Sequence, residues 1–291
     1  MNKIAFIVNP ISGGKNKKKI IELIKKRMSR ESVEWEIVPT QYAGHAITLA
    51  AQSQADVVVA VGGDGTVNEV ATGLTGTGKA LGIIPCGSGD GLALHLGLSR
   101  KPSKALEQLL CGQERPMDAG DMNGHPFFCT TGAGLDADVS LAFAKAASRG
   151  LKTYISKGWS TWKHYVPQVY NINVDGASTS LPAMFVTVAN ANQWGNRAKI
   201  APGASVSDGV LEVTVVKPFK LLSGPSLLWR LFAGSAYKGR KVVHLRGKDI
   251  VIERPSEGAV HFDGDPSQEG SSLHVTLKPS ALKVITPKDK I

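Results

Sequence analysis

Apolar and polar positions in the first 111 residues alternate between two patterns. Short apolar runs such as Val57–Val61 are typical of strands buried on both faces, and Ile20, Leu23, Ile24 and Met28 lie on one face of a helix. The predicted strands are 3–8, 33–38, 56–61 and 80–85, and the predicted helices are 15–28, 45–52, 66–74, 90–96 and 102–110. Repeated strand–helix units predict an α/β domain with a mostly parallel sheet.

The pattern changes after about residue 120. Asn123-Gly124 and Asp175-Gly176 each separate two strand-like runs, which is a hairpin signal. Further short runs, at 181–189, 210–216, 241–245, 250–253, 260–263, 273–277 and 282–285, predict an antiparallel β-sandwich with helical insertions near 138–168 and 220–238. We therefore expect an α/β domain over 1–120 and a β-sandwich domain over 121–278. The segment 279–291 could return to the first domain.

The composition of the chain excludes several classes of protein. Hydrophobic residues make up 42% and charged residues 20% of the 291, which is typical of a globular chain and not of a disordered one. The three cysteines are odd in number and follow no metal-site spacing, so neither a disulfide scaffold nor a zinc site is expected. No signal peptide and no run of about 18 apolar residues is present. These features predict a cytoplasmic protein without a spanning helix.

The formal net charge of +10 indicates an anionic partner. The first thirty residues hold nine Lys and Arg against one acid, and residues 139–170 combine five cations with six aromatic residues and no acid. No nucleic-acid-binding signature accompanies either segment. We interpret 139–170 as a basic, aromatic flap on an anionic membrane surface; an amphipathic helix packed on its own domain is the alternative.

Three glycine-containing loops each follow a predicted strand and precede a predicted helix. They are the first loop (9–14), the second loop (62–66) and the third loop (85–91). The carboxyl ends of parallel strands lie at one edge of a sheet, where glycine lets the backbone approach a phosphate and helices point N–H groups at it. No loop matches a Walker A or a full dinucleotide fingerprint. Asp64, the acid of the second loop, is suited to hold a metal ion or to accept a proton. The alternative is that it caps its own helix.

Six motifs in these loops and in the second domain resemble those of the diacylglycerol kinase and sphingosine kinase superfamily of lipid kinases. They occur in family order and cover residues 9 to 265. They are Asn9-Pro10-x-Ser12-Gly13, the run 61–70 around Gly62-Gly63-Asp64-Gly65, Pro85-x-Gly87-Ser88-Gly89-Asp90, Gly132-x-Gly134-Leu135-Asp136-Ala137-Asp138, the run 201–213 around Asp208-Gly209, and Phe262-Asp263-Gly264-Asp265.

This resemblance implies an ATP-dependent enzyme that phosphorylates a lipid hydroxyl. It implies an N-terminal domain like those of NAD kinases and phosphofructokinases, a lipid-carrying β-sandwich, and ATP in a cleft between them. The residues implied to contact the nucleotide are Asn9, Pro10, Ser12, Gly13, Thr40, Gly62, Gly63, Asp64, Gly65, Thr66, Val67, Asn68, Gly87 and Ser88. Asp90 and Asp265 depart from the family pattern, which has Asn and Glu at these positions.

The catalytic acid has more than one candidate. The sphingosine kinase pattern implies that Asp64 accepts the proton of the lipid hydroxyl, whereas the bacterial diacylglycerol kinase pattern implies the pair Asp263 and Asp265. A type I′ hairpin turn is the structural alternative for Asp263-Gly264. The resemblance also implies Mg²⁺ held by the Asp208 carboxylate and nearby oxygens from Ser205 and Val210, with a simple turn as the alternative.

The lipid itself stays open between diacylglycerol and a sphingoid base. Asp136 fits the diacylglycerol kinase pattern and Asp138 the sphingosine kinase pattern, and both are candidate substrate-binding residues. A carboxylate at 138 would favour a lipid that carries a protonated amine. Two other functions stay open: a kinase of a soluble substrate, resembling NAD kinase, and a non-catalytic lipid-binding protein. A homodimer is a further open possibility.

Overall fold

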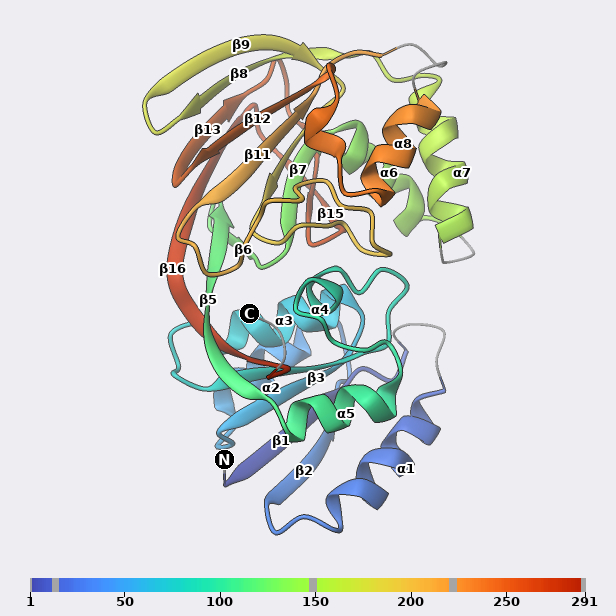
Figure 1. The fold of residues 1–291 in the computed structure, drawn as a ribbon, viewed down its shortest axis with the longest axis vertical. Helices are drawn as coiled ribbons and strands as arrows, with labels where there is room; N and C mark the ends of the chain where they lie inside the picture. The colour runs from blue at the N-terminus through green and yellow to red at the C-terminus, as the bar shows by residue number, and fades with distance from the viewer. Residues whose placement is uncertain (1, 12–15, 147–150, 220–223, 289–291) are drawn as a thin grey trace. The chain divides into compact units, whose positions relative to one another are not determined.

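The computed structural model describes residues 2–11, 16–146, 151–219 and 224–288 of the chain. Two compact units can be separated, and Figure 1 shows their elements. The first unit joins residues 1–117 to residues 280–291, and the second consists of residues 118–279. Two strands, β5 (Gln113–Met122) and β16 (Ser272–Thr286), run from one unit into the other.

The first unit is built on a parallel sheet. Its strand order is β2 (Glu34–Pro39), β1 (Lys3–Val8), β3 (Val57–Gly62) and β4 (Ala80–Pro85), and the end of β16 pairs in parallel with β4. The register places Val8 opposite Val61 and Gly62 opposite Pro85. The loops that follow β1, β3 and β4 therefore begin side by side at one edge of the sheet.

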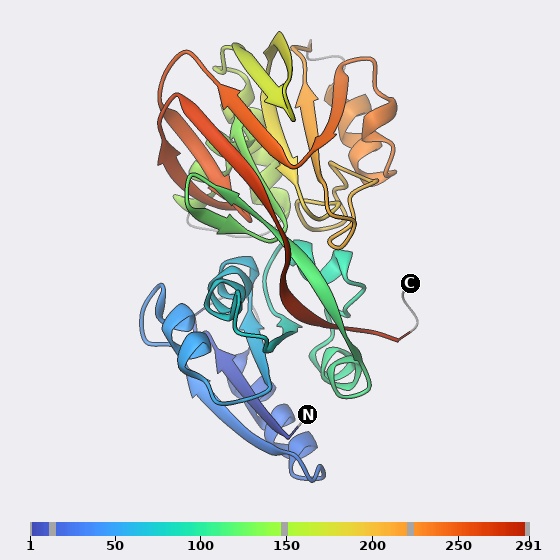
Figure 2. The ribbon, with the colours of Figure 1, turned by 90° about the vertical axis from the view of Figure 1, so that its left-hand side faces the viewer.

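Helices cover both faces of this sheet. The helices α1 (Lys17–Met28) and α5 (Pro102–Leu110) lie on one face, and α2 (His45–Gln52) and α3 (Asp64–Leu74) on the other (Figures 1 and 2). Alternate residues of β1, such as Phe6, pack with Ile24 of α1 in one buried cluster. Each such fully buried side chain contributes roughly 1.5–3 kcal/mol of hydrophobic stabilisation. Another helix of this unit, α4 (Gly91–His95), is short and follows β4.

The second unit is a β-sandwich, as the sequence predicts. One sheet has the antiparallel order β12 (Val242–Gly247), β11 (Leu211–Val216), β10 (Phe185–Ala189), β7 (Thr130–Gly134), β14 (Gly258–Phe262) and β15 (Asp265–Glu269). The other contains β13 (Asp249–Glu253), β8 (Gln168–Val174), β9 (Ala177–Ala183), β6 (His125–Phe127) and the unit's parts of β5 and β16. Side chains from both sheets, among them Val186, Val213, Ile250 and Val275, form one buried core.

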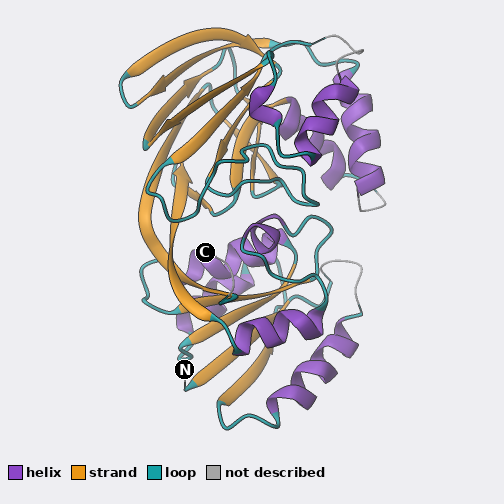
Figure 3. Ribbon diagram, viewed as in Figure 1, coloured by secondary structure: helices purple, strands orange, loops and turns teal. Residues whose placement is uncertain are grey.

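Three helices gather beside the six-stranded sheet (Figure 3). They are α6 (Leu135–Ala144), α7 (Leu151–Trp162) and α8 (Gly224–Phe232), followed by a 3₁₀ turn at Ala236–Lys238. A second apolar cluster joins Leu135 and Val139 of α6 to Phe185 and Ala189 of β10. Because side chains alternate along a strand, these β10 residues lie on the opposite face from Val186.

Two predicted strand boundaries are wrong. The predicted strand 181–189 is two strands, β9 and β10, which belong to different sheets. A nearly continuous apolar run carries no period that marks the change of sheet. The predicted strands 273–277 and 282–285 are one strand, β16, which continues through the polar residues between them. Both predicted hairpin turns are confirmed, with positive φ at both turn residues as a type I′ turn requires.

Candidate functional site

The first and second loops are joined by a hydrogen bond between side chains. Asn9, directly after β1, donates from Nδ2 to Oγ1 of Thr66 at 3.1 Å, and its Oδ1 accepts the amide of Ile11 at 3.2 Å. Thr66 is buried in the first turn of α3. A Cβ atom at Gly62 would lie 2.4 Å from this threonine side chain, so glycine at position 62 leaves the room that Thr66 occupies.

Asp64 connects the second loop to the third. It is the first residue of α3, whose N-cap is Gly63. Its carboxylate oxygens accept the backbone N–H groups of Asp90 at 2.9 Å and Gly91 at 2.7 Å. Asp64 therefore caps the beginning of α4. Since each carboxylate oxygen has two lone pairs, these bonds orient the group without exhausting its capacity to accept.

The second and third loops also touch directly through glycine. A Cβ atom at Gly87 would lie 2.7 Å from the Cα of Gly63, and a Cβ atom at Gly63 would lie 3.1 Å from the Cα of Gly87. No side chain fits between two backbones at this separation. Glycine at these two positions therefore permits the approach of the loops.

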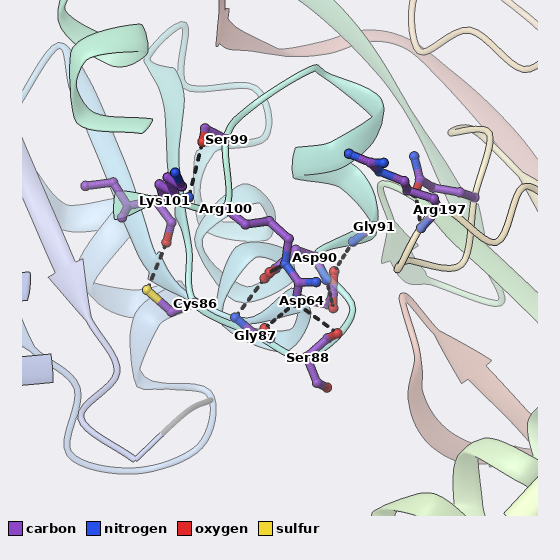
Figure 4. A network of polar contacts seen from close by, with 12 residues as sticks. Asp64, Cys86, Gly87, Ser88, Asp90, Gly91, Ser99, Arg100, Lys101 and Arg197 are labelled. Carbon is purple, nitrogen blue, oxygen red and sulfur yellow. Dashed lines mark hydrogen bonds and ion pairs between the residues drawn. The ribbon is translucent and has the colours of Figure 1, made fainter. Parts of the chain in front are cut away.

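The third loop is held by an acid of its own and by a distant arginine (Figure 4). Asp90 is buried with a φ of 53°, a left-handed conformation that Asp tolerates better than most residues. Its Oδ1 accepts the amide of Gly87 at 2.7 Å, and its Oδ2 accepts Nε of Arg100 at 2.8 Å. Nη2 of Arg100 donates to the carbonyl oxygens of Gly87 and Ser88, each at 3.0 Å.

A glutamate of α3 places the segment that contains Thr40. Oε1 and Oε2 of Glu69 accept the amides of Gly44 at 2.9 Å and Ala46 at 3.1 Å, which caps the beginning of α2. Thr40 is buried, and its amide donates to the carbonyl of Val8 at the end of β1. The segment after β2 is thereby tied to the motif after β3.

The described members of the predicted nucleotide group therefore belong to neighbouring loops at one edge of the sheet. Gly65, Val67 and Asn68 lie in the first turns of α3, and Ser88 is half-buried in the third loop. Pro10 is exposed after β1. Ser12 and Gly13 lie outside the described residues.

The other two predicted catalytic acids belong to the hairpin between β14 and β15. The carboxylate of Asp263 accepts the backbone N–H groups of three consecutive residues, Phe128 at 3.0 Å, Cys129 at 2.7 Å and Thr130 at 3.0 Å. Asp263 and Gly264 both have positive φ, as in a type I′ turn. Asp265 is exposed at the first position of β15. Asp263 therefore anchors its hairpin to the segment that leads into β7.

Asp136 is the centre of a buried polar network. Its Oδ2 accepts the Thr187 hydroxyl at 2.8 Å and lies 3.3 Å from Nε2 of His261, and its Oδ1 accepts the amide of Ala137 at 2.8 Å. Asp136 and His261 are both more than nine-tenths buried. A carboxylate enclosed in this way supports the strands around it; whether it contacts a substrate stays a prediction.

Asp138, two residues further along α6, is only half-buried, and its side chain makes no hydrogen bond with any residue in the described ranges. Burial and the nearby Asp136 raise the pKa of its carboxyl above the ordinary value, while Arg254 opposes this rise. The hydroxyls of Tyr165 and Tyr170 are buried close by, and burial raises the pKa of both phenols. The surroundings of Asp138 thus combine an acid with phenol groups.

The carboxylate of Asp208, a predicted magnesium ligand, contacts other groups of the protein. Oδ2 of Asp208 accepts Nη2 of Arg246 at 2.8 Å, and its Oδ1 accepts the amide of Val210 at 3.4 Å. Nε of Arg246 also pairs with Glu212 at 2.8 Å. Among the described residues no group of three or more His, Cys, Asp or Glu could hold a metal ion. In the structure the guanidinium of Arg246 neutralises the Asp208 carboxylate; Mg²⁺ held by Asp208 with oxygens of Ser205 and Val210 stays a prediction.

Large apolar side chains are exposed on α7 and α8. Trp159 is 48% exposed and Trp229 is 67% exposed, and Ile155, Leu228 and Phe232 are exposed as well. Nζ of Lys163 lies 5.8 Å from the centre of the Trp159 ring. The side chains of Lys152 and Tyr154, and all of Arg149, lie outside what the structure describes. No helix in the described ranges is long and apolar enough to cross a membrane.

Several contacts escape sequence reasoning. Arg100 and Arg254 lie in none of the recognised motifs. Arg254 is nevertheless buried, and it donates to the carbonyls of Gly258, Ala259, Glu269 and Gly270. The contacts of Thr187 and His261 with Asp136 could be expected only from the positions of these residues on strands next to the motifs. Glu69 was inside a recognised motif, but its partners lie 23 and 25 residues away along the chain.

Two family models match the chain. The diacylglycerol kinase catalytic domain matches residues 3–122. The YegS C-terminal NAD kinase beta sandwich-like domain matches residues 129–286, which is more than half of the chain. The two matches therefore cover the α/β part and the sandwich part in order.

Individual relatives agree with these matches over the whole length. A diacylglycerol kinase of Bacillus subtilis is 26% identical over 298 aligned residues, covering 100% of this chain and 98% of the relative. A Klebsiella pneumoniae protein named a probable YegS-like lipid kinase is 27% identical, covering 89% and 88%. The crystal structure of a candidate diacylglycerol kinase from Bacillus anthracis superimposes with a TM-score of 0.84 at 25% identity, covering 99% and 98%. This chain therefore belongs to the family of bacterial diacylglycerol kinases and YegS-like lipid kinases.

Proposed function

We propose that this protein is an ATP-dependent lipid kinase that transfers the γ-phosphate of ATP to a lipid hydroxyl. The observation that carries the proposal is the set of three loops at one edge of the parallel sheet, joined through Asn9 and Asp64, with the third loop held by Arg100. Membership of the family implies the use of ATP. The loops supply backbone N–H groups at helix beginnings, which is the arrangement that binds phosphate.

In this proposal the first unit holds the nucleotide. Gly62, Gly63 and Gly87 allow the close packing of the second and third loops, and Thr40 and Ser88 carry hydroxyls. Mg²⁺, when bound with ATP, neutralises charge on the phosphates during transfer. The protein's own part is to orient the phosphates by N–H groups whose directions are set before binding.

A carboxylate must accept the proton of the lipid hydroxyl as the new P–O bond forms and the bond to the departing ADP breaks. Asp263 already holds three backbone N–H groups, which suits it to anchoring the hairpin. Asp64, oriented by two backbone N–H groups, and Asp265, exposed in the hairpin, are the better-suited proton acceptors. We assign the role to Asp64.

The lipid belongs to the second unit in this proposal. Asp138 and the phenols of Tyr165 and Tyr170 supply polar groups at the edge of an apolar cluster made by α6, β10 and their neighbours. A polar head group and an apolar chain require these two kinds of surface side by side. The exposed aromatic residues of α7 and α8 would rest on an anionic membrane from which the lipid is taken.

A phosphate-transfer screen tests the proposal. The whole chain is incubated with γ-³²P-ATP, Mg²⁺ and mixed micelles of diacylglycerol, a sphingoid base or ceramide, with NAD as a soluble acceptor. We expect label in a lipid and not in NAD. Label in NAD alone would indicate a soluble-substrate kinase, and label in no acceptor would support a non-catalytic protein. The variant Asp64→Asn serves as the blank.

A further inference from the structure

We propose that Arg100 is a positioning residue that aims the backbone N–H groups of Ser88 and Gly89 at a phosphate of the nucleotide. This inference rests on the proposed function, in that the third loop is taken as part of the nucleotide site. It concerns a residue that lies outside every motif of the sequence.

The guanidinium of Arg100 holds the third loop from one side. Its Nη2 lies 3.0 Å from the carbonyl oxygens of both Gly87 and Ser88, and its Nε lies 2.8 Å from Oδ2 of Asp90. Two consecutive carbonyls therefore point toward the same cation. Figure 4 shows this convergence, with the Ser88 side chain directed away from Arg100.

The direction of the carbonyls decides the direction of the amides. In a planar trans peptide the C=O of one residue and the N–H of the next point in opposite directions. With the carbonyls of Gly87 and Ser88 aimed at Arg100, the N–H groups of Ser88 and Gly89 point to the other side of the loop. Among the described residues none accepts a hydrogen bond from either N–H. Successive N–H groups with one direction form a concavity that binds anions.

The remaining contacts of the loop prevent it from turning over. The amide of Gly87 is held by Asp90, and the amides of Asp90 and Gly91 are held by Asp64. The donors at both ends of the loop are thus consumed internally, and the two in the middle are left for a ligand. Arg100 acts on these two through the carbonyls, without having to touch the ligand itself.

Asp90 offers another explanation for any effect of an Arg100 variant, namely destabilisation of the fold, and the experiment must distinguish it. Its carboxylate is buried, and Arg100 neutralises it, so loss of Arg100 would leave an uncompensated buried charge. A variant of Arg100 alone could therefore fail through instability. The double variant Asp90→Asn with Arg100→Met removes the charge, and the Asn side-chain oxygen can still accept the Gly87 amide.

The test measures two quantities on the whole chain: the dissociation constant of ATP by calorimetry, and the melting temperature without nucleotide. We expect Arg100→Met to lower the melting temperature and to weaken ATP binding by about tenfold or more, the loss of roughly one hydrogen bond to a charged group. In the double variant the melting temperature should return toward that of the wild type while ATP binding stays about tenfold weaker.

Two further variants complete the design. Arg100→Lys keeps a positive charge beside Asp90 but lacks the planar fork that reaches both carbonyls, so it should stay folded and bind ATP more weakly. Lys101→Met, at the exposed neighbouring position, should leave both quantities unchanged.

Wild-type ATP affinity in the double variant or in Arg100→Lys would overturn the inference, because Arg100 would then only neutralise Asp90. A wild-type chain that binds ATP but labels no lipid would refute the proposed lipid kinase and leave the inference to be decided by the affinities. A wild-type chain that binds no ATP would overturn both.

Discussion

At the scale of single residues, the side chain of Asp64 has both a structural and a proposed catalytic role. Its oxygens hold the N–H groups of Asp90 and Gly91, which lie 26 and 27 residues further along the chain. The same group is our proton acceptor. Structure and chemistry at this position therefore respond together to a substitution.

We predict that Asp64→Asn lowers phosphate transfer by about 100-fold or more, the usual scale for loss of a general base. An amide also presents an NH₂ group where a backbone N–H must be accepted, which should destabilise the fold by about 1–3 kcal/mol. Transfer kinetics and thermal unfolding measure the two effects separately. Asp56→Asn is a matched control, since Asp56 accepts the amides of Asn2 and Lys3 in the same unit. More than a tenth of wild-type activity in Asp64→Asn would contradict the assignment.

Asp138 gives a prediction of pH dependence. Burial and Asp136 raise the pKa of its carboxyl in the folded chain above the ordinary 3.8. The folded state then binds the proton more tightly than the unfolded state, so stability is greatest below that ordinary value and falls as the pH rises through the raised pKa. Asp138→Asn removes this loss. Its melting temperature should exceed that of the wild type by a few degrees at pH 7 and match it at pH 3, and equal melting temperatures at both pH values would contradict the raised pKa.

The same position tests the choice of lipid. If Asp138 selects a protonated amine, Asp138→Asn raises the Michaelis constant for a sphingoid base, because a charge-assisted hydrogen bond becomes a neutral one. The constant for diacylglycerol should barely change. Equal changes for both lipids would show that Asp138 acts only on the structure, and a wild-type enzyme that phosphorylates diacylglycerol and ignores sphingosine would end the amine hypothesis.

At the scale of elements, the nucleotide region depends on how closely loops and helices approach. Gly63 and Gly87 bring the second and third loops together, and Gly73 does the same for α3 and α2, where a Cβ atom would lie 2.3 Å from the carbonyl oxygen of Ile47. Backbone atoms cannot be repacked as side chains can. Each of these glycines therefore determines a distance between elements.

We predict that Gly87→Ala separates the second and third loops and weakens ATP binding by about tenfold, with a loss of stability of about 1–3 kcal/mol, as overpacking produces. The new methyl group would lie 2.7 Å from the Cα of Gly63 and 2.9 Å from Oδ1 of Asp90. Calorimetry with ATP and thermal unfolding give the two values. Gly270→Ala is the control, because nothing lies within 4 Å of its added Cβ atom. Unchanged ATP affinity in Gly87→Ala would show that the spacing of the loops does not matter for the nucleotide.

At the scale of the whole molecule, a net charge of +10 is combined with exposed aromatic residues on α7 and α8. Neither the charge nor the exposed rings of Trp159 and Trp229 form part of the two main buried clusters of the described residues. Together they are typical of a surface that rests on an anionic bilayer, where apolar rings enter the interface and cations remain at the phosphates.

We predict salt-sensitive binding to vesicles that contain anionic lipid, with each basic residue contributing about 1 kcal/mol at most. Reversal of Lys157 and Lys163 to Glu, with Trp159→Ala, should weaken vesicle sedimentation about tenfold or more and leave ATP binding unchanged. The control reverses Lys18 and Lys19, which are exposed on α1. Equal sedimentation of wild type and variant would refute a membrane surface on α7.

Much of the architecture follows from the order of residues alone. The strands at 3–8 and 80–85 and the helices at 45–52 and 102–110 are predicted with their observed bounds. Asn123-Gly124 turns as predicted. The sequence also places three glycine-containing loops at one sheet edge, because a parallel sheet brings the carboxyl ends of its strands together. Periodicity and turn chemistry are local properties, and local properties can be predicted from a sequence.

The contacts that the predicted residues make depend on the packing of the whole chain. The carboxylate of Asp64 accepts a backbone N–H group at the start of α4. The carboxylate of Asp263 accepts N–H groups 133 to 135 residues away along the chain. Arg100 contacts the third loop, to which no sequence motif connects it. A hydrogen bond requires donor and acceptor within about 3 Å in a suitable direction. That condition depends on the packing of whole elements, which no spacing along the chain expresses, so the residue types were predictable and their partners were not.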